Sequence, residues 1–488
     1  MSLKVELTIE KTDLMFQEDT FFTVTITNEG AEPVQTMTPG NSWTLPALRV
    51  VSRATGWEHT FRRPRDLFLF EEESSLPPNQ PLTSQYRFLR YVDFPRAGEY
   101  DVSLLWEWDG GDGRAFSAPV TVRIHDVQPS GLFTASSSGG PNLLHIAVWI
   151  NTAGEKPKLC RSIISLGRKA SVLETQDLGT VGPGIRPVLS VPHGGGSTDE
   201  QWVAWFVGND LQFALTGSPD EPLTLNHLPL SSVPKHIVAP LNHFSGAQGT
   251  EGKFFLWQSN PEGTISRFQA VHVDPKGNAE AQANAMLKGT QPVWTRAAFL
   301  KNQTSRTYAA SHQKGTLSLQ AVIWPESGEL EPAKSLGQWD GEFIGGGTML
   351  DTEDTVHGAI LVWETGPPES RRLLLYPWRH DAEGQFEATA EPIQIPREPG
   401  QRPIDAVVAV NVRGGPCALV LFQDEGWRYF EPEGGLKALP AAVAHTDGPL
   451  DLLFPNISPE PLILYAEPGK GFFFIKTTGE QAGPPPSG

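Results

Sequence analysis

Residues 360–363 read Ile360-Leu-Val-Trp363, an apolar segment that ends in an aromatic residue and runs into a turn with glycine. The same pattern occurs at Ile146-Ala-Val-Trp149, Val203-Ala-Trp205 and Phe254-Phe-Leu-Trp257, and weaker copies end at Phe422 and Tyr465. The spacing places one more copy near Ser311, where the aromatic residue is missing. A repeat of about fifty residues, present in seven copies, therefore organises most of the chain.

Each copy is preceded by one short apolar segment and followed by another, so each unit is expected to hold three or four strands. A clear example of the following strand is Leu211–Leu215, and a fourth, weaker strand usually comes after it. The preceding segments lie near Leu132, Val188, Ile237, Val293, Phe343, Ile404 and Leu450.

Four strands per repeat are typical of a propeller blade, and the last 350 residues or so resemble β-propellers as a class. The seventh copy lacks a fourth strand, because the chain ends in Ala482-Gly-Pro-Pro-Pro-Ser-Gly soon after Phe472-Phe-Phe-Ile475. We expect an N-terminal strand of the propeller to complete this blade, which would close the ring and remove open strand edges. Six or eight blades stay open as alternatives to seven.

The first 127 residues alternate apolar and polar side chains, as half-buried strands do. Phe22, Val24 and Ile26 point one way while the threonines between them point the other, and the same alternation recurs from Tyr100 to Trp108. Turn clusters such as Asn28-Glu-Gly separate these segments. Several strands with such turns in about 125 residues predict a β-sandwich, because each one-sided sheet must bury its apolar face on another.

The end of this region carries a family resemblance. Phe94-Pro-Arg-Ala-Gly98-Glu-Tyr100, followed by Ser117-Ala-Pro-Val-Thr-Val122, resembles the last two strands of bacterial immunoglobulin-like domains. Tyr100 lies where a tyrosine corner would be found. The resemblance implies a domain that positions or pairs other molecules and carries no catalysis.

These patterns predict an all-β protein with an N-terminal Ig-like β-sandwich and a C-terminal seven-bladed β-propeller. We place the sandwich at residues 1–127, a linker with the start of the propeller at 128–141, the propeller at 142–480 and a flexible tail at 481–488. The linker is assigned from Pro129-Ser-Gly and Ser136-Ser-Ser-Gly-Gly-Pro141.

The net charge of −18, from 56 acidic and 38 basic residues, disfavours binding to nucleic acid or anionic lipid. Local basic exceptions are Arg62 to Arg65 and the pair Arg371 and Arg372. No apolar run approaches the roughly 18 residues that span a bilayer, so no membrane insertion is expected. The N-terminus lacks a signal-peptide pattern, and two distant cysteines, Cys160 and Cys417, favour a reducing, cytoplasmic location.

A set of polar residues recurs just after the first strand of the repeats and would lie on one face of the ring. Such convergent groups are candidates for ligand binding at the propeller mouth, although Asn, Asp and His are also ordinary turn residues. We expect no metal site and no cofactor, and the acidic run from Asp351 to His357 is interpreted as a solvated loop. The candidates are His193, His243, Asn302, Asp351, Asn411 and Asn456.

The sequence favours a non-catalytic scaffold that binds other proteins, in a larger bacterial assembly. No catalytic motif is present, since His193-Gly-Gly-Gly196 lacks the nucleophile elbow that accompanies such a loop in hydrolases. Phe68 and Phe70, beside acidic residues, are the interface candidates. The oligomeric state is not set by the sequence.

The sequence leaves two other functions open. A glycan-binding or glycan-cleaving propeller would need exposed aromatic rings, and it predicts solvent exposure of Trp294, Trp339, Trp378 and Trp427. A metal-dependent hydrolase at the propeller mouth would hold metal in the purified protein.

Overall fold

The computed structural model shows a protein built almost entirely of β-strands, which confirms the all-β prediction. Its one described helix is α1 (Ala441–Ala444), and no helix in the described part of the chain could cross a membrane. The structure describes residues 3–478 of 488 except 38–46, 62–72, 89–91, 93, 109–112, 137–143, 166–170, 182–187, 190–200, 208–209, 217–223, 230–235, 245–249, 260–265, 275, 288–290, 301–303, 314, 326–329, 352, 368, 389–390, 412, 447–449, 455–460 and 468–470.

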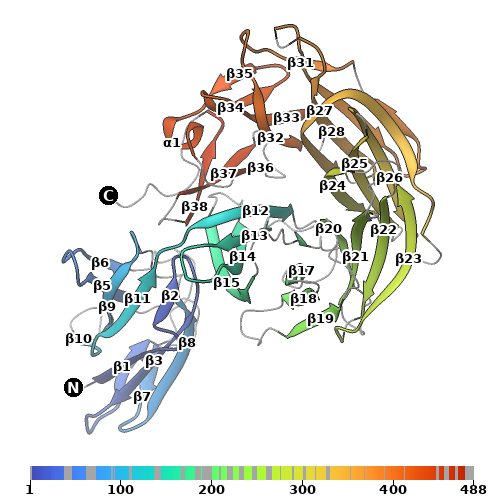
Figure 1. Cartoon of the computed structure of the whole chain (residues 1–488). Coiled ribbons are helices and arrows are strands. Elements are labelled where there is room, and N and C mark those ends of the chain that lie inside the picture. The colour runs from blue at the N-terminus through green and yellow to red at the C-terminus, as the bar shows by residue number, and fades with distance from the viewer. Residues whose placement is uncertain are drawn as a thin grey trace.

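The N-terminal domain contains two main sheets (Figure 1). The smaller sheet has the strand order β1 (Leu3–Ile9), β3 (Phe21–Asn28), β8 (Pro81–Arg87). The larger has the order β2 (Asp13–Met15), β11 (Val120–His125), β9 (Gly98–Trp108), β5 (Ala47–Ser52), β6 (Glu58–Phe61), with β10 (Gly113–Phe116) also on β9. A separate pair is formed by β4 (Val34–Met37) and β7 (Glu73–Leu76).

The two main sheets bury their apolar faces in one core, as the alternating pattern predicts. Phe22 and Val24 of β3 and Val102 of β9 have no exposed surface and belong to the same cluster. Tyr100 is buried beside them and its hydroxyl donates a hydrogen bond of 2.7 Å to the carbonyl oxygen of Arg96. The predicted corner residue therefore ties the start of β9 to the turn before it.

Six sheets follow the N-terminal domain around a ring, in the arrangement of a β-propeller (Figure 1), and one of them, with eight strands, divides at β27 (Lys334–Leu350) into two, which gives seven successive sheets. The first three blades have four strands each. They are β12 (Pro129–Ser136), β13 (Leu144–Asn151), β14 (Lys158–Ser165), β15 (Ser171–Thr180); β16 (Val188–Leu189), β17 (Gln201–Val207), β18 (Asp210–Thr216), β19 (Leu225–Pro229); β20 (His236–Phe244), β21 (Thr250–Ser259), β22 (Ser266–Val273), β23 (Ala279–Leu287).

The fourth and fifth blades share one long strand, β27 (Lys334–Leu350). Residues 334–340 pair with β26, and residues 341–350 pair with β28, so β27 is the outer strand of one blade and the inner strand of the next. The other strands are β24 (Gln291–Phe299), β25 (Ser305–Gln313), β26 (Thr316–Trp324), β28 (Val356–Glu364), β29 (Leu373–His380), β30 (Phe386–Ala388) and β31 (Ile393–Ile395).

The last two blades complete the ring. Each of the seven predicted first segments lies in the first strand of a blade, and these first strands contact one another in chain order, with β36 returning to β12. The strands are β32 (Pro403–Val410), β33 (Pro416–Phe422), β34 (Gly426–Glu431), β35 (Gly435–Ala438) and β36 (Leu450–Leu453), β37 (Leu462–Glu467), β38 (Gly471–Lys476).

Two expectations for this region were wrong. The N-terminal strand of the propeller, β12, belongs to the first blade, and among the described residues the seventh sheet has three strands. The segment that begins at Pro129 is not a linker, because residues 129–136 form β12 and pair with β13. Proline is tolerated there because Pro129 is the first residue of the strand, so its missing N–H removes no hydrogen bond from the interior of the strand pair.

The repeated aromatic residues lie in the second strand of their blades, and those whose side chains are described are buried. Trp149, Trp205 and Trp363 keep 1%, 1% and 3% of their surface. Where the pattern lacks its aromatic residue, Ser311 still lies in the second strand and is fully buried. The aromatic repeat therefore marks the core between blades.

A run of three glycines in β27 allows the inner strands to approach closely. A Cβ on Gly345 would lie 2.6 Å from the carbonyl oxygen of Ala406, and one on Gly347 would lie 2.0 Å from that of Val408. A Cβ on Gly346 would lie 2.9 Å from the indole ring of Trp294. Only glycine therefore fits where β27 passes β32 and β24.

Candidate functional site

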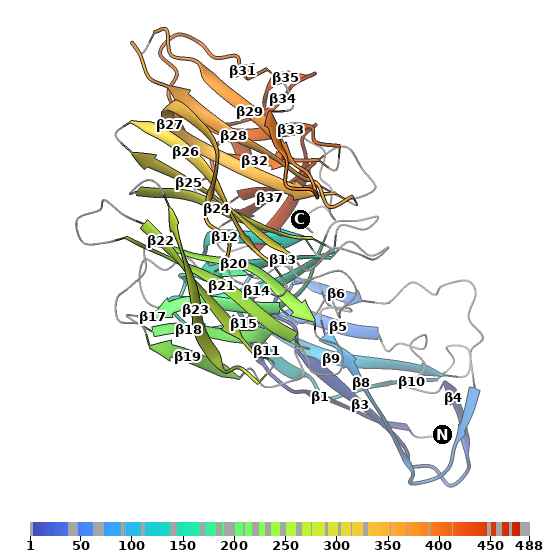
Figure 2. The same cartoon turned by 90° about the vertical axis from the view of Figure 1, so that its right-hand side faces the viewer.

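The N-terminal domain meets the propeller through a tight turn after β2, which we call the junction loop (residues 15–18). The turn is closed by a hydrogen bond of 3.0 Å from the Glu18 amide to the Met15 carbonyl oxygen. The Glu18 carboxylate accepts one from the Met15 amide at 2.8 Å. Figure 2 shows the N-terminal domain projecting from the ring beside β14 and β15.

Apolar side chains of the junction loop enter the propeller core. Met15 Sδ lies 3.9 Å from Cys160 Sγ, and the Asn151 side-chain amide donates to it at 3.4 Å. Phe16 and Phe472 belong to the same buried cluster, which also includes Trp149. Burial in these surroundings raises the pKa of Cys160, so its thiol stays protonated.

Gln17 binds the backbone of the last propeller strand, β38, at Phe472. Its side-chain Nε2 donates to the carbonyl oxygen of Phe472, and its Oε1 accepts from the Phe472 amide, each at 3.3 Å. The carboxamide thus makes the two bonds that a neighbouring strand would make. Gln17 holds a left-handed backbone with φ of 66°, and Gly471 has no side chain to block it, since a Cβ there would lie 2.6 Å from Gln17 Oε1.

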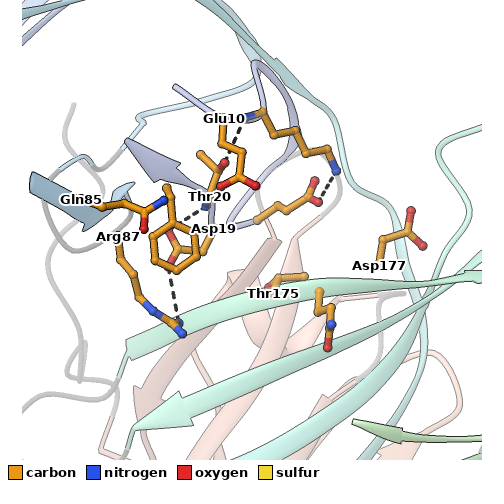
Figure 3. Close-up of a pocket in the computed structure, with 11 residues that line it drawn as sticks. Glu10, Asp19, Thr20, Gln85, Arg87, Thr175 and Asp177 are labelled. Atoms are coloured by element: carbon orange, nitrogen blue, oxygen red, sulfur yellow. Dashed lines mark hydrogen bonds and ion pairs between the residues drawn. The ribbon is translucent and has the colours of Figure 1, made fainter. Parts of the chain in front are cut away.

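A pocket of about 570 Å³ lies beside the junction loop, between the N-terminal domain and the outer strand β15 of the first blade. Figure 3 shows Glu10 and Thr20 on one wall and Thr175 and Asp177 on the facing strand. The lining residues are Glu10, Lys11, Glu18, Asp19, Thr20, Phe21, Gln85 and Arg87 from the N-terminal domain and Thr175, Gln176 and Asp177 from the propeller.

The pocket is polar and carries more acidic than basic groups. The lining includes four carboxylates and two basic side chains. Both basic side chains form ion pairs with lining carboxylates. Lys11 Nζ lies 2.5 Å from Glu18 Oε1, whose side chain is only 8% exposed, and Arg87 Nη1 lies 3.8 Å from Asp19 Oδ2. A ligand that enters this pocket therefore meets fixed charges held by both domains.

Two of the polar residues predicted to surround the propeller mouth, Asp351 and Asn411, form hydrogen bonds within their own turns. Asp351 Oδ1 accepts from the amides of Glu353 and Thr355 at 2.8 and 2.9 Å. Asn411 Oδ1 accepts from the amides of Arg413 and Gly415, each at 2.9 Å. Each side chain therefore stabilises the turn between the first and second strands of its own blade, and the two turns are equivalent.

These two turns lie side by side on one face of the ring. His357 Nε2 pairs with Asp351 Oδ2 at 2.9 Å, and a Cβ on Gly414 would lie 2.8 Å from His357 Nδ1. The structure thus brings the Asp351 and Asn411 turns together. His193, Asn302, Asn456, Phe68 and Phe70 lie outside the described residues, and His243 lies in β20, where its side chain is not described.

None of the four tryptophans proposed for sugar stacking is exposed. Trp378 and Trp427 are buried, at 2% and 7% exposure, while Trp294 and Trp339 are half-buried against an interblade core. Within the described part of the chain, no three His, Cys, Asp or Glu side chains are grouped to hold a metal.

No family model and no curated protein matches this sequence. The chain is similar to solved structures at low identity. A mutant Aleuria aurantia lectin in complex with Fucα1-6GlcNAc is 12% identical with a TM-score of 0.37, covering 73% of this chain and 98% of the lectin. A Pyrococcus horikoshii acylaminoacyl peptidase is 11% identical with a TM-score of 0.37, covering 73% of this chain and 52% of the peptidase. A PL25 ulvan lyase is 9% identical with a TM-score of 0.38, covering 70% and 88%.

The turn residues give a prediction about pH. Burial alone would raise the pKa of Asp351, but hydrogen bonds from His357 and from two backbone amides hold it below its usual value of 3.8. A carboxyl group with a lowered pKa stabilises the fold above its unfolded-state pKa, and this stabilisation is lost as the pH falls through the folded value. We expect Asp351→Ala to cost about 1 kcal/mol at pH 7 and less at pH 3, measured by urea unfolding.

Asn411→Ala is the matched control, because it removes the same turn bonds without a titrating group. Its cost is expected to be similar at pH 7 and pH 3. Equal pH dependence of the two variants would contradict the role assigned to the Asp351 carboxylate.

Sequence reasoning missed the junction loop and the pocket. The segment Met15-Phe-Gln-Glu-Asp19 places two apolar residues before a polar run in a turn between two strands. Apolar residues in such a turn could have indicated that it packs against another part of the protein. The partner residues on β15 and β38 lie about 160 and 455 residues away, so no local pattern connects them.

Proposed function

We propose that this protein is a non-catalytic interaction protein that holds two β-rich parts in one fixed arrangement. The observation that carries the proposal is the shared core at the junction, in which Phe22 and Val102 belong to the same cluster as Trp149 and Leu464. Domain interfaces within one chain are usually more polar and permit relative motion. A shared core restricts that motion, so a partner can bind across both parts without ordering them first.

We further propose that residues 1–127 are an immunoglobulin-like sandwich and that the ring is a seven-bladed propeller. The two-sheet core and the Tyr100 hydrogen bond support the first assignment, and the seven successive sheets support the second. We take the propeller to begin at Pro129 and to extend to about residue 480, with residues 481–488 as a tail.

The partner in this proposal is another protein in a larger bacterial assembly, located in the cytoplasm. Cys160 and Cys417 are both buried free thiols, which supports a reducing compartment. The excess of acidic residues favours a basic partner surface, because complementary charge speeds association.

Affinity capture with junction variants tests the proposal. The full chain is immobilised and exposed to lysate of the source organism, and bound proteins are quantified by mass spectrometry. We expect wild type to retain a stoichiometric partner and Phe16→Asp to retain several-fold less, because a buried carboxylate at the junction loosens the two parts.

Phe116→Asp is the matched control, since Phe116 is an exposed residue of β10 and does not belong to the shared core. It is expected to capture as wild type does, and circular dichroism checks that both variants keep their strands. The proposal fails if wild type retains no stoichiometric partner. It also fails if Phe16→Asp retains as much partner as wild type.

A further inference from the structure

We propose that His380 is an acid-sensitive latch between the fourth and fifth blades, which releases the turn at residues 381–385 when its imidazole becomes protonated. We call this turn the latch turn. It joins β29 to β30, and His380 is the last residue of β29. The His380 side chain has no exposed surface and contacts the fourth blade. The inference concerns the ring itself and does not depend on the proposed interaction function.

Two side chains of the fourth blade hold the latch turn in place. Tyr308 of β25 is fully buried, and its hydroxyl oxygen is hydrogen-bonded to His380 Nδ1 at 3.0 Å. Arg306 of the same strand is 3% exposed, and its guanidinium donates to three consecutive backbone carbonyl oxygens, those of residues 380–382. Arg306 therefore fixes the turn of one blade to the inner part of the next.

The hydrogen bonds around His380 suit a neutral imidazole and not a charged one. A neutral ring has one N–H and one acceptor nitrogen, so the Tyr308 hydroxyl can satisfy Nδ1 in either tautomer. A protonated ring donates from both nitrogens. His380 Nε2 is buried and forms no hydrogen bond with the described residues, so its charged N–H would be left without an acceptor. The new charge would also lie close to the buried guanidinium of Arg306.

The groups near His380 act on its charge in both directions, and those that oppose protonation prevail. Burial and the Arg306 charge lower the pKa of His380 from 6.5 to about 4. The Gly384 backbone and the Asp381 carboxylate favour the charged form, while Lys334 of β27 opposes it. The folded ring therefore keeps this imidazole neutral at a pH where an exposed histidine is protonated.

The other neighbours of His380 do not titrate in the same range. Val356 of β28 and Phe386 of β30 lie opposite it in the sheet, and neither carries a charge. Burial raises the pKa of Tyr308, so the phenol stays protonated. A histidine whose pKa is lowered in the closed state stabilises that state fully above the open-state pKa of 6.5. Below 6.5 the opening equilibrium rises about tenfold per pH unit, until the pH reaches the closed-state pKa.

Release of the latch turn would change the surface that the ring presents. The Phe386 ring packs on Trp378 and His380, with 5.6 and 6.3 Å between ring centroids, and Trp378 is 2% exposed. Opening separates these rings from β25 and brings apolar surface into contact with water. Acid would thus create a surface on the fifth blade that is closed at neutral pH.

Hydrogen exchange of the full chain, read by mass spectrometry and corrected for the intrinsic pH dependence of exchange, tests the latch. The amides of Asp381, Gly384 and Gln385 are hydrogen-bonded within the latch turn, so their exchange reports its opening. We expect the opening equilibrium to rise about thirtyfold from pH 7.5 to pH 5.0, because only the open form takes up the proton. No rise, or an equal rise in peptides from β33 of the sixth blade, would overturn the proposal.

Variants at two histidines of the fifth blade assign the rise to one side chain. His380→Gln keeps a hydrogen-bonding group beside the Tyr308 hydroxyl but does not titrate, and His380→Phe keeps a ring against Phe386 without either nitrogen. In both variants we expect a rise of about threefold or less. His357→Gln is the matched control, because His357 lies in β28 and pairs with Asp351 in another turn. It should keep the wild-type rise.

A full rise in either His380 variant, or loss of the rise in His357→Gln, would assign the titration to another group and overturn the latch. If neither His380 variant folds, the wild-type protein and His357→Gln decide. A rise confined to the latch turn in both proteins supports the proposal, and a rise spread over all blades contradicts it.

Discussion

Replacement of Gly347 by valine will lower the free energy of unfolding by about 3 kcal/mol or more, because the new side chain has no room. A Cβ at this position would lie 2.0 Å from the carbonyl oxygen of Val408, which belongs to the neighbouring inner strand β32. A backbone oxygen cannot rotate away as a flexible side chain can. The two inner strands must therefore separate, and that separation would open the core between the fifth and sixth blades.

Urea unfolding followed by tryptophan fluorescence measures this effect, because Trp363 lies in the core that the two strands enclose. Gly154→Ala is the control: its Cβ would meet only the Lys156 carbonyl oxygen at 3.8 Å, an ordinary contact. We expect that variant to stay within about 0.5 kcal/mol of wild type. Unchanged stability of Gly347→Val would mean that β27 and β32 do not approach as closely as described.

Phe472→Ala is expected to cost about 3 to 5 kcal/mol and to loosen the junction between the two parts of the chain. The ring of Phe472 is 3% exposed and meets Trp149 edge-on, with 5.2 Å between ring centroids. It therefore joins the last blade to the first, and the Gln17 side chain binds its backbone. Hydrogen exchange of the junction loop, read by mass spectrometry together with urea unfolding, should show faster exchange in the variant.

Phe473→Ala separates ring closure from general damage to β38. Phe473 is the next residue, is half-buried, and packs on Tyr465 with 5.9 Å between centroids in a different core cluster. Its loss should reduce stability less and leave exchange in the junction loop unchanged. Equal loosening of the junction by both variants would contradict the assigned role of Phe472.

Local sequence patterns predicted the strands well because successive side chains of a strand point to opposite faces, so that apolar and polar residues alternate. Phe22, Val24 and Ile26 are fully buried as the alternation requires, and the first strands of all seven blades lie where the repeat placed them. The candidate functional site was not predicted from the sequence. Of the polar residues chosen for the propeller mouth, Asp351 and Asn411 hold their own turns, and the described pocket lies elsewhere.

The sequence by itself determined the all-β class, the two-part order and the repeat, because hydrophobic periodicity and turn residues act over a few neighbours. Only the tertiary structure decided how the ring closes and where the pocket forms. Gln17 meets Phe472 and Glu10 faces Asp177 across long separations in the chain, and such pairs depend on how whole sheets pack. The physical reason is that the sequence around a side-chain amide or carboxylate does not indicate which distant residue will lie beside it in the folded chain.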